Sequence, residues 1–342
     1  MTASFVHLHL HSEYSLVDST LRIKPLVKRC IELGQPAVAI TDQSNLFALI
    51  KFYKAAEAAG IKPIVGADLY LADPGEERGR VTVLCRDRDG YLALSRLLSR
   101  AYLEGHQGDH VRVRPDWLRH DRDGLFLIAG HASPLGRLLA AGRSDRAEAL
   151  LDDWRGQFPD RLYLEITRTG RDGEDAFNTA AIALADRYDL PLLASNDVRF
   201  LSRDDFDAHE ARVCIASGRV LDDPRRPRDY SAEQYLKSCE DMATLFADLP
   251  EALANTVELA RRCNLSLEFG TYHLPDFPVP DGETLDSWIR NQARAGLASR
   301  LDSQPTAVGH SVDDYRTRLE TELDVIVAMG FPGYFLIVAD FI

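Results

Sequence analysis

The sequence has little of what marks secreted, membrane-embedded or disulfide-stabilised proteins. Its 342 residues include only five cysteines, an odd number, and none of them is spaced as CxxC. This usage favours reduced thiols in a cytoplasmic protein. No run of about 18 apolar residues occurs, so we expect no segment that spans a membrane. The N-terminus also lacks the basic region and apolar core of a signal peptide.

Positive charge is also in deficit. The chain has 40 Lys and Arg residues against 53 Asp and Glu residues, which gives a formal net charge of −13. Because a surface that binds nucleic acid is normally basic, any contact with DNA must be local or must lie outside this chain. Apolar residues make up 45% and charged residues 27% of the sequence. This balance is ordinary for a globular protein and excludes a disordered or fibrous chain.

The first 200 residues alternate between short apolar runs and longer amphipathic stretches. Seven apolar runs predict β-strands: 4–10, 36–41, 63–71, 80–85, 125–130, 162–167 and 190–195. Helical patterns lie between most of them: from Pro25 to Gly34, over 46–60, from about Asp89, and over 172–189. Repeated βα units indicate a mainly parallel sheet with right-handed crossovers, and seven units suit a closed barrel.

The pattern changes after residue 200. Helices without strands are expected to about residue 270, and the proline-rich stretch 273–282 is typical of a linker. Two amphipathic helices are expected at 284–301 and 313–329. The chain then ends in the apolar segment GYFLIVADFI, without a helix cap or a polar tail. Such a bare apolar end predicts that the chain is a fragment of a longer protein.

Polar side chains follow nearly every predicted strand. They are His7, His9, His11, Thr41, Asp42, Asp68, His131, Glu165, Asn196 and Asp197. In a parallel barrel the carboxyl ends of the strands meet on one face, so we expect these residues to share one rim. Asp, Asn and Thr at strand ends are also common helix N-caps, which is an alternative for Asp42 or Asn196 taken singly.

The HLHLH segment is the most informative of these strand ends. A period of two places His7, His9 and His11 on one face of a strand and Leu8 and Leu10 on the other. Three imidazoles followed by a nearby aspartate favour a site for divalent metals, since neutral histidine and carboxylate are common zinc ligands. A polar edge strand or hydrogen-bonded core histidines are the alternatives.

Several segments together resemble one family. Residues 7–18, 39–71 and 195–200 resemble the polymerase-and-histidinol-phosphatase (PHP) domain, in the form found at the N-terminus of the alpha subunit of bacterial DNA polymerase III. The resemblance continues through 222–231, 245–264 and 272–280, and 318–342 resembles the opening of that polymerase's palm. It implies an α/β fold, a distorted seven-stranded (β/α) barrel of PHP type followed by helical segments. The implied domains are a PHP domain over 1–270 (barrel about 1–200), an extended linker over 271–282 and a truncated palm over 283–342.

The resemblance also implies a set of metal ligands. Metal-competent PHP domains hold three metals with nine ligands, which fall here on His9, His11, Asp18, Gln43, Asp68, Arg80, His131, Asp197 and Arg199. Gln43, Arg80 and Arg199 stand where the family has histidine, and Asp68 replaces a bridging glutamate. An arginine stays protonated and has no lone pair to donate. The resemblance therefore implies at most one residual divalent metal, zinc or manganese, on His9, His11, Asp68 and Asp197, with Asp18 and His131 as further cluster positions.

These substitutions predict the chemistry of the site. Two-metal hydrolysis needs two cations about 3.5–4 Å apart, so a phosphoesterase built on this site should be dead or very weak, and no catalytic residue is expected in this chain. We expect guanidinium groups to replace the missing cations. Arg199 would then pair with Asp18, and Arg80 with Asp68, which would neutralise buried carboxylates.

For function, the resemblance implies part of a replicative polymerase that uses Mg²⁺ and reaches DNA through the full-length protein. The palm aspartates of the family would lie beyond Ile342, so this chain is expected to support the other polymerase domains and the replisome. It is also expected to dock the proofreading exonuclease subunit, epsilon. One alternative is a residual metal-dependent phosphoesterase, either a 3′–5′ exonuclease or a pyrophosphatase. A stand-alone phosphatase for small substrates is a third possibility, which the palm-like end disfavours.

Overall fold

The computed structural model describes residues 5–71, 79–107, 110–226, 228–271 and 275–342. The chain forms two compact units, Met1–Leu267 and Glu268–Ile342. The first unit contains all the described strands and all the residues proposed above as ligands. The candidate functional site therefore lies in the first unit.

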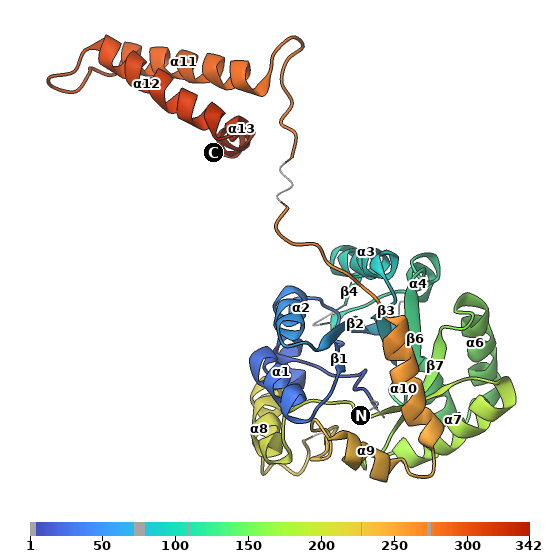
Figure 1. Ribbon diagram of the computed structural model, residues 1–342. Helices are drawn as coiled ribbons and strands as arrows, with labels where there is room; N and C mark the ends of the chain where they lie inside the picture. Colours follow the sequence, from blue (N-terminus) through green and yellow to red (C-terminus); the bar gives the residue numbers. More distant parts are fainter. Residues whose placement is uncertain (1–4, 72–78, 108–109, 227, 272–274) are drawn as a thin grey trace. The chain divides into compact units, whose positions relative to one another are not determined.

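The first unit is built on a curled six-stranded sheet (Figure 1). Its strands, in spatial order, are β1 (Ala37–Ile40), β2 (Lys62–Leu71), β3 (Gly79–Cys85), β6 (Leu125–Ala129), β7 (Leu162–Thr167) and β8 (Leu192–Ser195). The pairs β1–β2, β6–β7 and β7–β8 are parallel. Strand β3 runs antiparallel to both of its neighbours, which distorts an otherwise parallel barrel.

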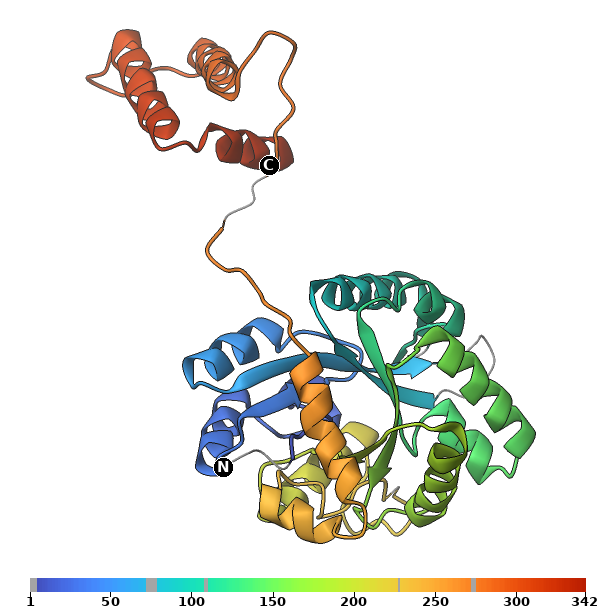
Figure 2. The same cartoon turned by 45° about the vertical axis from the view of Figure 1, so that its right-hand side comes forward.

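Helices surround this sheet, as both views of the ribbon show (Figures 1 and 2). Those that precede the last strand are α1 (Ile23–Glu32), α2 (Leu49–Ala58), α3 (Arg88–Glu104), α4 (Pro115–His120), α5 (Pro134–Ala140), α6 (Ser144–Gln157) and α7 (Glu174–Tyr188). Those that follow it are α8 (Phe206–Ser217), α9 (Cys239–Leu245) and α10 (Pro250–Arg262). Two 3-10 helices, η1 (Glu13–Asp18) and η2 (Arg203–Asp205), and the short pair β4 (His106–Gln107) and β5 (His110–Val111) complete the unit.

The seventh predicted strand, over residues 4–10, is not a regular strand. The described part, residues 5–10, makes only isolated bridges, from His7 to Val38 beside β1 and from Leu10 to Val198 beyond β8. The segment nevertheless connects the two edges of the sheet. The prediction of seven strands is therefore not confirmed, although the other six appear within a few residues of their expected positions.

Side-chain hydroxyls explain why residues 5–10 do not form a continuous ladder. The backbone N–H of Val6 donates to Thr256 Oγ1 at 3.0 Å, and that of Leu10 donates to Thr41 Oγ1 at 3.1 Å. In a regular strand these amides would donate to backbone carbonyls of a neighbouring strand. The threonines thus interrupt the ladder while keeping the buried amides hydrogen-bonded.

The strand faces divide the core into two layers. Val65, Val83 and Leu164 belong to the large apolar cluster that includes residues of the surrounding helices. Residues of opposite parity, such as Ile64 and Leu84, form a second cluster together with residues of α10. Because side chains alternate along a strand, these two clusters occupy opposite faces of the sheet.

The inner face changes from apolar to charged along its strands. On β2 it runs from Ile64 to Asp68, and on β3 from Leu84 back to Arg80. Asp68 pairs in register with Thr82, and both are buried. The sheet therefore presents one apolar and one charged end on its inner face, and the charged end lies toward the carboxyl ends of the parallel strands.

The second unit consists of three helices, α11 (Leu285–Ser303), α12 (Val312–Ala328) and α13 (Pro332–Phe341). Ile289, Leu323 and Leu336 form its buried core. The two helices predicted here are α11 and α12, and the apolar terminal segment forms a third. Among the described residues no single helix is long and apolar enough to cross a membrane, and α12 with α13 meets that criterion only when joined across a 113° bend.

Candidate functional site

Seven of the nine positions proposed as ligands meet at the charged end of the barrel. We call these residues the charged cluster: His9, His11, Asp18, Asp68, Arg80, Asp197 and Arg199. They come from the segment before η1, the end of η1, the paired strands β2 and β3, and the residues after β8. Carboxyl ends of parallel strands thus bring distant parts of the sequence to one place, as expected.

The two histidines of the charged cluster both turn Nε2 toward one carboxylate. His9 Nε2 lies 3.0 Å and His11 Nε2 2.9 Å from Asp68 Oδ2. The other ring nitrogen of each is held by a different acid, with His9 Nδ1 2.7 Å from Glu165 and His11 Nδ1 2.6 Å from Asp18. Histidine ligands of metals are typically oriented in this way, by a carboxylate on the second ring nitrogen.

His7 does not join them. Its Nε2 is 2.9 Å from the backbone oxygen of Lys237, and its Nδ1 has no hydrogen-bond partner in the described structure. The prediction that His7, His9 and His11 act on one common face was therefore wrong for His7. A period of two requires a regular strand, and residues 5–10 do not form one.

Both predicted arginine–aspartate pairs are confirmed. Arg199 Nη1 lies 2.8 Å from Asp18 Oδ2, and Arg80 Nε lies 3.0 Å from Asp68 Oδ2. Arg199 also contacts Asp197 through Nη2. The Arg199 side chain is completely buried. Charge-assisted pairs of this kind compensate the desolvation of buried carboxylates.

Both carboxylate oxygens of Asp68 have partners within the protein. Its Oδ2 receives both histidines and Arg80, while its Oδ1 accepts a hydrogen bond from Thr82 Oγ1 at 2.5 Å. Both oxygens that could bind a metal are therefore occupied by protein donors.

Sequence reasoning missed a third guanidinium. Arg171, in the loop between β7 and α7, places Nη1 2.6 Å from Asp197 Oδ2. Glu174, the first residue of α7, accepts hydrogen bonds from Thr167 and Thr169. The available signal was the run of charged residues directly after a predicted strand, at the rim where the other residues gather.

A strap of residues 228–236 also reaches the charged cluster. The Tyr230 hydroxyl donates a hydrogen bond to Asp18, and Gln234 Nε2 donates to Asp197 Oδ2 at 3.1 Å. The backbone N–H of Arg199 donates to the Gln234 carbonyl at 2.8 Å. The strap supplies contacts to two of the carboxylates from outside the barrel, and nothing in its sequence alone indicates this role.

Electrostatics favour the charged form of every acid in the centre of the charged cluster. Burial alone would raise the pKa of Asp18, Asp68 and Asp197, but the neighbouring cations outweigh it and lower all three. Burial would likewise lower the pKa of His9, yet Asp68, Glu165 and Asp197 raise it to about 10. His9 is therefore protonated at neutral pH in this arrangement, and a protonated imidazole cannot ligate a metal.

The residues present fit one divalent ion at most. Ligand atoms of His9, His11 and Asp68 lie within 4.8 Å of one another, and two imidazoles with a carboxylate are a suitable donor set. Binding of such an ion would require Arg80 to move away from Asp68 and His9 to lose its proton. Arg80 and Arg199 cannot serve as ligands, so the second and third ions of the implied cluster do not fit.

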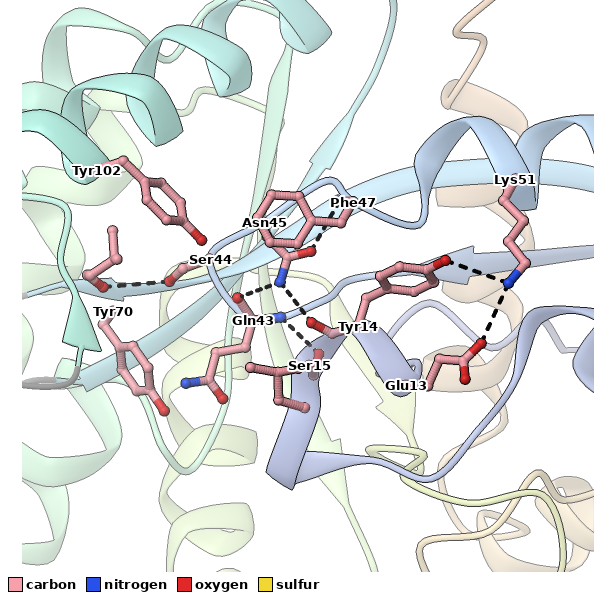
Figure 3. Close-up of a pocket in the computed structure, with 12 residues that line it drawn as sticks. Glu13, Tyr14, Ser15, Gln43, Ser44, Asn45, Phe47, Lys51, Tyr70 and Tyr102 are labelled. Carbon is pink, nitrogen blue, oxygen red and sulfur yellow. Dashed lines mark hydrogen bonds and ion pairs between the residues drawn. The ribbon is translucent and has the colours of Figure 1, made fainter. Parts of the chain in front are cut away.

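The two remaining positions lie apart from the centre. Gln43 pairs with Asp68 through a backbone bridge, but its side chain lines a different pocket, shown in Figure 3. His131 is half-buried at a small opening beside His9, Arg171 and Asp197. Burial and the nearby Arg171 lower the pKa of His131.

Two family models match parts of this chain. Residues 7–169 match the PHP domain, and residues 287–342 match the bacterial DNA polymerase III alpha NTPase domain. The chain is 58% identical over its whole length to the DNA polymerase III subunit alpha of Xylella fastidiosa, strain Temecula1, and covers 30% of that protein. It is 47% identical over 99% of its length to the same subunit of Escherichia coli K12, again covering 30%.

A solved structure is similar as well. A two-domain protein from Bacteroides vulgatus with a predicted PHP-like metal-dependent phosphoesterase is 15% identical, with a TM-score of 0.38, over 57% of this chain and 52% of that one. The chain thus spans about 30% of the length of the curated relatives named above.

Proposed function

The chain belongs to the DNA polymerase III alpha subunit family and carries its PHP domain, and from this premise we propose that it forms the N-terminal part of a replicative DNA polymerase. The similarity of the whole chain to alpha subunits, at 58% identity with the Xylella protein, supports this proposal. The full-length protein would copy a DNA template in the cytoplasm, with Mg²⁺ as the cofactor of nucleotidyl transfer. Primer extension by the full-length protein, with and without Mg²⁺, tests this activity.

For this chain itself we propose a structural role. The single observation that carries it is the replacement of cations by guanidinium groups, since Arg80, Arg171 and Arg199 pair with the acids that would otherwise hold metals. These pairs join η1, β2, β3, the loop between β7 and α7 and the segment after β8 through side-chain contacts. The barrel then supports the remaining polymerase domains and offers a surface for the proofreading exonuclease subunit, epsilon.

The second candidate is a residual phosphoesterase. It is favoured by one observation, the convergence of His9, His11 and Asp68 with each imidazole oriented by a further acid. A zinc or manganese ion bound there would supply Lewis-acid chemistry at a phosphoryl oxygen. The chain's own contribution would be to hold the ion and to exclude water around it.

Metal content and hydrolysis separate the two candidates. The purified chain is incubated with Mn²⁺ or Zn²⁺, its bound metal is measured, and hydrolysis of single-stranded DNA 3′ ends and of pyrophosphate is assayed. The matched control carries His9→Ala and Asp197→Ala, with EDTA treatment of the unchanged chain as a second control. We expect no activity above either control. Activity that is lost in the double variant, and lost with EDTA but restored by Mn²⁺, would establish the phosphoesterase instead.

The docking role needs its own test. We expect this chain and purified epsilon to form a complex at micromolar concentration, measured by calorimetry and by co-elution in gel filtration. The double variant above should bind epsilon equally well if it remains folded, because docking does not use the buried charged cluster. Absence of a complex at that concentration would contradict the docking role.

A further inference from the structure

A second pocket lies beside the charged cluster and is separate from it. It has a volume of about 540 Å³, within the range of small-molecule sites. Figure 3 shows its lining, which includes Gln43, Ser44, Phe47, Lys51 and Tyr102. We propose that this aromatic pocket binds a nucleobase, either of a free nucleotide or of a single-stranded DNA end. This proposal does not depend on the function assigned to the charged cluster.

Exposed aromatic rings form one part of the aromatic pocket. The Phe47 side chain is 65% exposed and that of Tyr102 is 39% exposed. Their ring centroids are 6.4 Å apart with an interplanar angle of 51°, so the rings do not cover each other's faces. Such open rings are the platforms on which bases stack, because every base has a π face.

The side-chain amide of Gln43 forms another part of the aromatic pocket. The backbone of Gln43 is fixed, since its N–H donates to Ser15 Oγ at 3.0 Å and its carbonyl accepts from Asn45 Nδ2 at 3.0 Å. Its side-chain amide makes no hydrogen bond to any described residue, and Figure 3 shows it pointing away from the dashed contacts. A primary amide offers a donor and an acceptor side by side, which matches the edge of a base such as adenine.

Asn45 provides the contrast within the same loop. Its Nδ2 donates to the Tyr14 and Gln43 carbonyls at 3.1 and 3.0 Å, and its Oδ1 accepts from the Phe47 N–H at 3.0 Å. Asn45 therefore shapes the loop, while the Gln43 amide stays available for a ligand.

The backbone around the aromatic pocket is strained. Leu16 has φ 54° and ψ −103°, and Ser44 has φ 52°, both unusual for residues other than glycine. Near Leu16 on one side, the Ser15 hydroxyl donates to Asp42, and on the other side Asp18 accepts from Arg199. With both neighbours held in the interior, the Leu16 side chain is turned outward and Leu16 is 69% exposed. Strain of this kind is concentrated at ligand sites.

The lining favours a base over an apolar peptide side chain. An apolar group could cover Leu16 and Phe47, but it would remove water from the Gln43 amide without giving it a partner. Lys51 is the one basic residue among the described residues of the lining, and its Nζ lies 3.6 Å from Glu13 Oε1 and 5.5 Å from the Tyr14 ring centre. One lysine suits one phosphate, not a long tract of nucleic-acid backbone, and this agrees with the acidic balance of the chain.

The test is direct binding to the 342-residue chain. Calorimetry and ligand-observed NMR are used with the four deoxynucleoside 5′-monophosphates in one arm and with a single-stranded hexanucleotide in the other. We expect saturable binding in at least one arm, which also distinguishes a free nucleotide from a strand end. Phe47→Ala and Gln43→Ala should each weaken it about tenfold. Phe47→Tyr should retain it, and Leu103→Ala, an exposed apolar side chain outside the lining, is the matched control.

Three results would overturn the proposal. The first is no binding of any of these probes at millimolar concentration. The second is an equal loss in Phe47→Ala and Leu103→Ala while thermal unfolding shows both to be folded. The third is displacement of the nucleotide by N-acetyl-leucinamide at similar concentration, which would make the aromatic pocket a site for peptide side chains.

Discussion

The charged cluster and the aromatic pocket are neighbours with opposite properties. Asp18 and Leu16 lie on the same 3-10 helix, yet Asp18 is buried against Arg199 while Leu16 is exposed in the lining of the aromatic pocket. In the charged cluster nearly every polar atom is paired with another side chain. In the aromatic pocket, rings and an amide face solvent. The resemblance assigns this rim of the barrel to metal chemistry. In the charged cluster the chain's own side chains occupy the ligand atoms, whereas in the neighbouring aromatic pocket the side chains are accessible to a ligand.

The largest effect is expected from removing the central cation of the charged cluster. Arg199→Ala would leave Asp18 and Asp197 buried without their shared guanidinium, which should lower the free energy of unfolding by roughly 3–5 kcal/mol. Urea unfolding measures this loss. Arg203→Ala, which breaks an exposed pair with Glu233, is the control and should cost about 1 kcal/mol or less. A similar small loss in both variants would remove the contrast between buried and exposed pairs.

The next effect is a stability maximum near pH 6.5. The pKa of His9 is raised to about 10, so its contribution is present below the ordinary value of 6.5 and is lost as the pH rises toward 10. Burial lowers the pKa of His7 to about 4, so stability is lost as the pH falls from 6.5 toward 4. Unfolding by urea between pH 4 and 10 should follow this curve, with changes on the order of a few kcal/mol.

Two variants assign the limbs of that curve. His9→Gln should flatten the alkaline limb. His7→Gln should reduce the acid limb, to which His131 and His209 also contribute because burial lowers their pKa, so each variant serves as the control for the other. An alkaline limb that is unchanged in His9→Gln would show that another group causes it.

A smaller effect is expected at the strap. Tyr230→Phe removes the hydroxyl that donates to Asp18 and should cost about 1–3 kcal/mol, because the lost hydrogen bond is to a charged group. Thermal unfolding provides the measurement. Tyr235→Phe is a suitable control, since in the described part of the chain no hydrogen bond joins the Tyr235 hydroxyl to the charged cluster, and its backbone carbonyl accepts from Asn196. Equal stability of the two variants would show that the Tyr230 hydroxyl does not stabilise that network.

The smallest effect on stability is expected in the aromatic pocket. Phe47→Ala should change the free energy of unfolding by about 0.5 kcal/mol or less, because the side chain is mostly exposed. Denaturant unfolding checks this. A loss of more than about 2 kcal/mol would show that Phe47 is part of the core, and the contrast between a closed and an open region would then fail.

Much of the barrel could be predicted from local pattern. Six apolar runs became strands, and the pattern that ends at Gly34 became α1, where Gly34 takes φ +64° beyond the helix end. The seventh strand failed for a reason that no local pattern contains. The amides of Val6 and Leu10 are taken by hydroxyls of Thr256 and Thr41, one of them 250 residues away.

The sequence predicted those features of the site that depend on the chemistry of a residue type. It predicted less well those that depend on the direction in which a side chain points. Arg80 and Arg199 were expected to pair with acids because an arginine cannot act as a ligand, and both pairs are present. The sequence does not distinguish Arg171 from other charged loop residues, and its contact with Asp197 depends on the fold. Gln43 was assigned to the metal cluster by position, but its side chain lines the aromatic pocket.

The sequence by itself determined the PHP resemblance, the βα organisation of the first 200 residues and the loss of three histidine ligands, because these depend on residue identity and spacing. Only the tertiary structure decided which carboxylate oxygen each arginine contacts, that His7 turns away, and that the Gln43 amide has no hydrogen-bond partner among the described residues. The physical reason is the length of chain involved. Arg199 and Asp18 are 181 residues apart, and a contact that distant is specified by packing of the whole barrel and not by any local pattern.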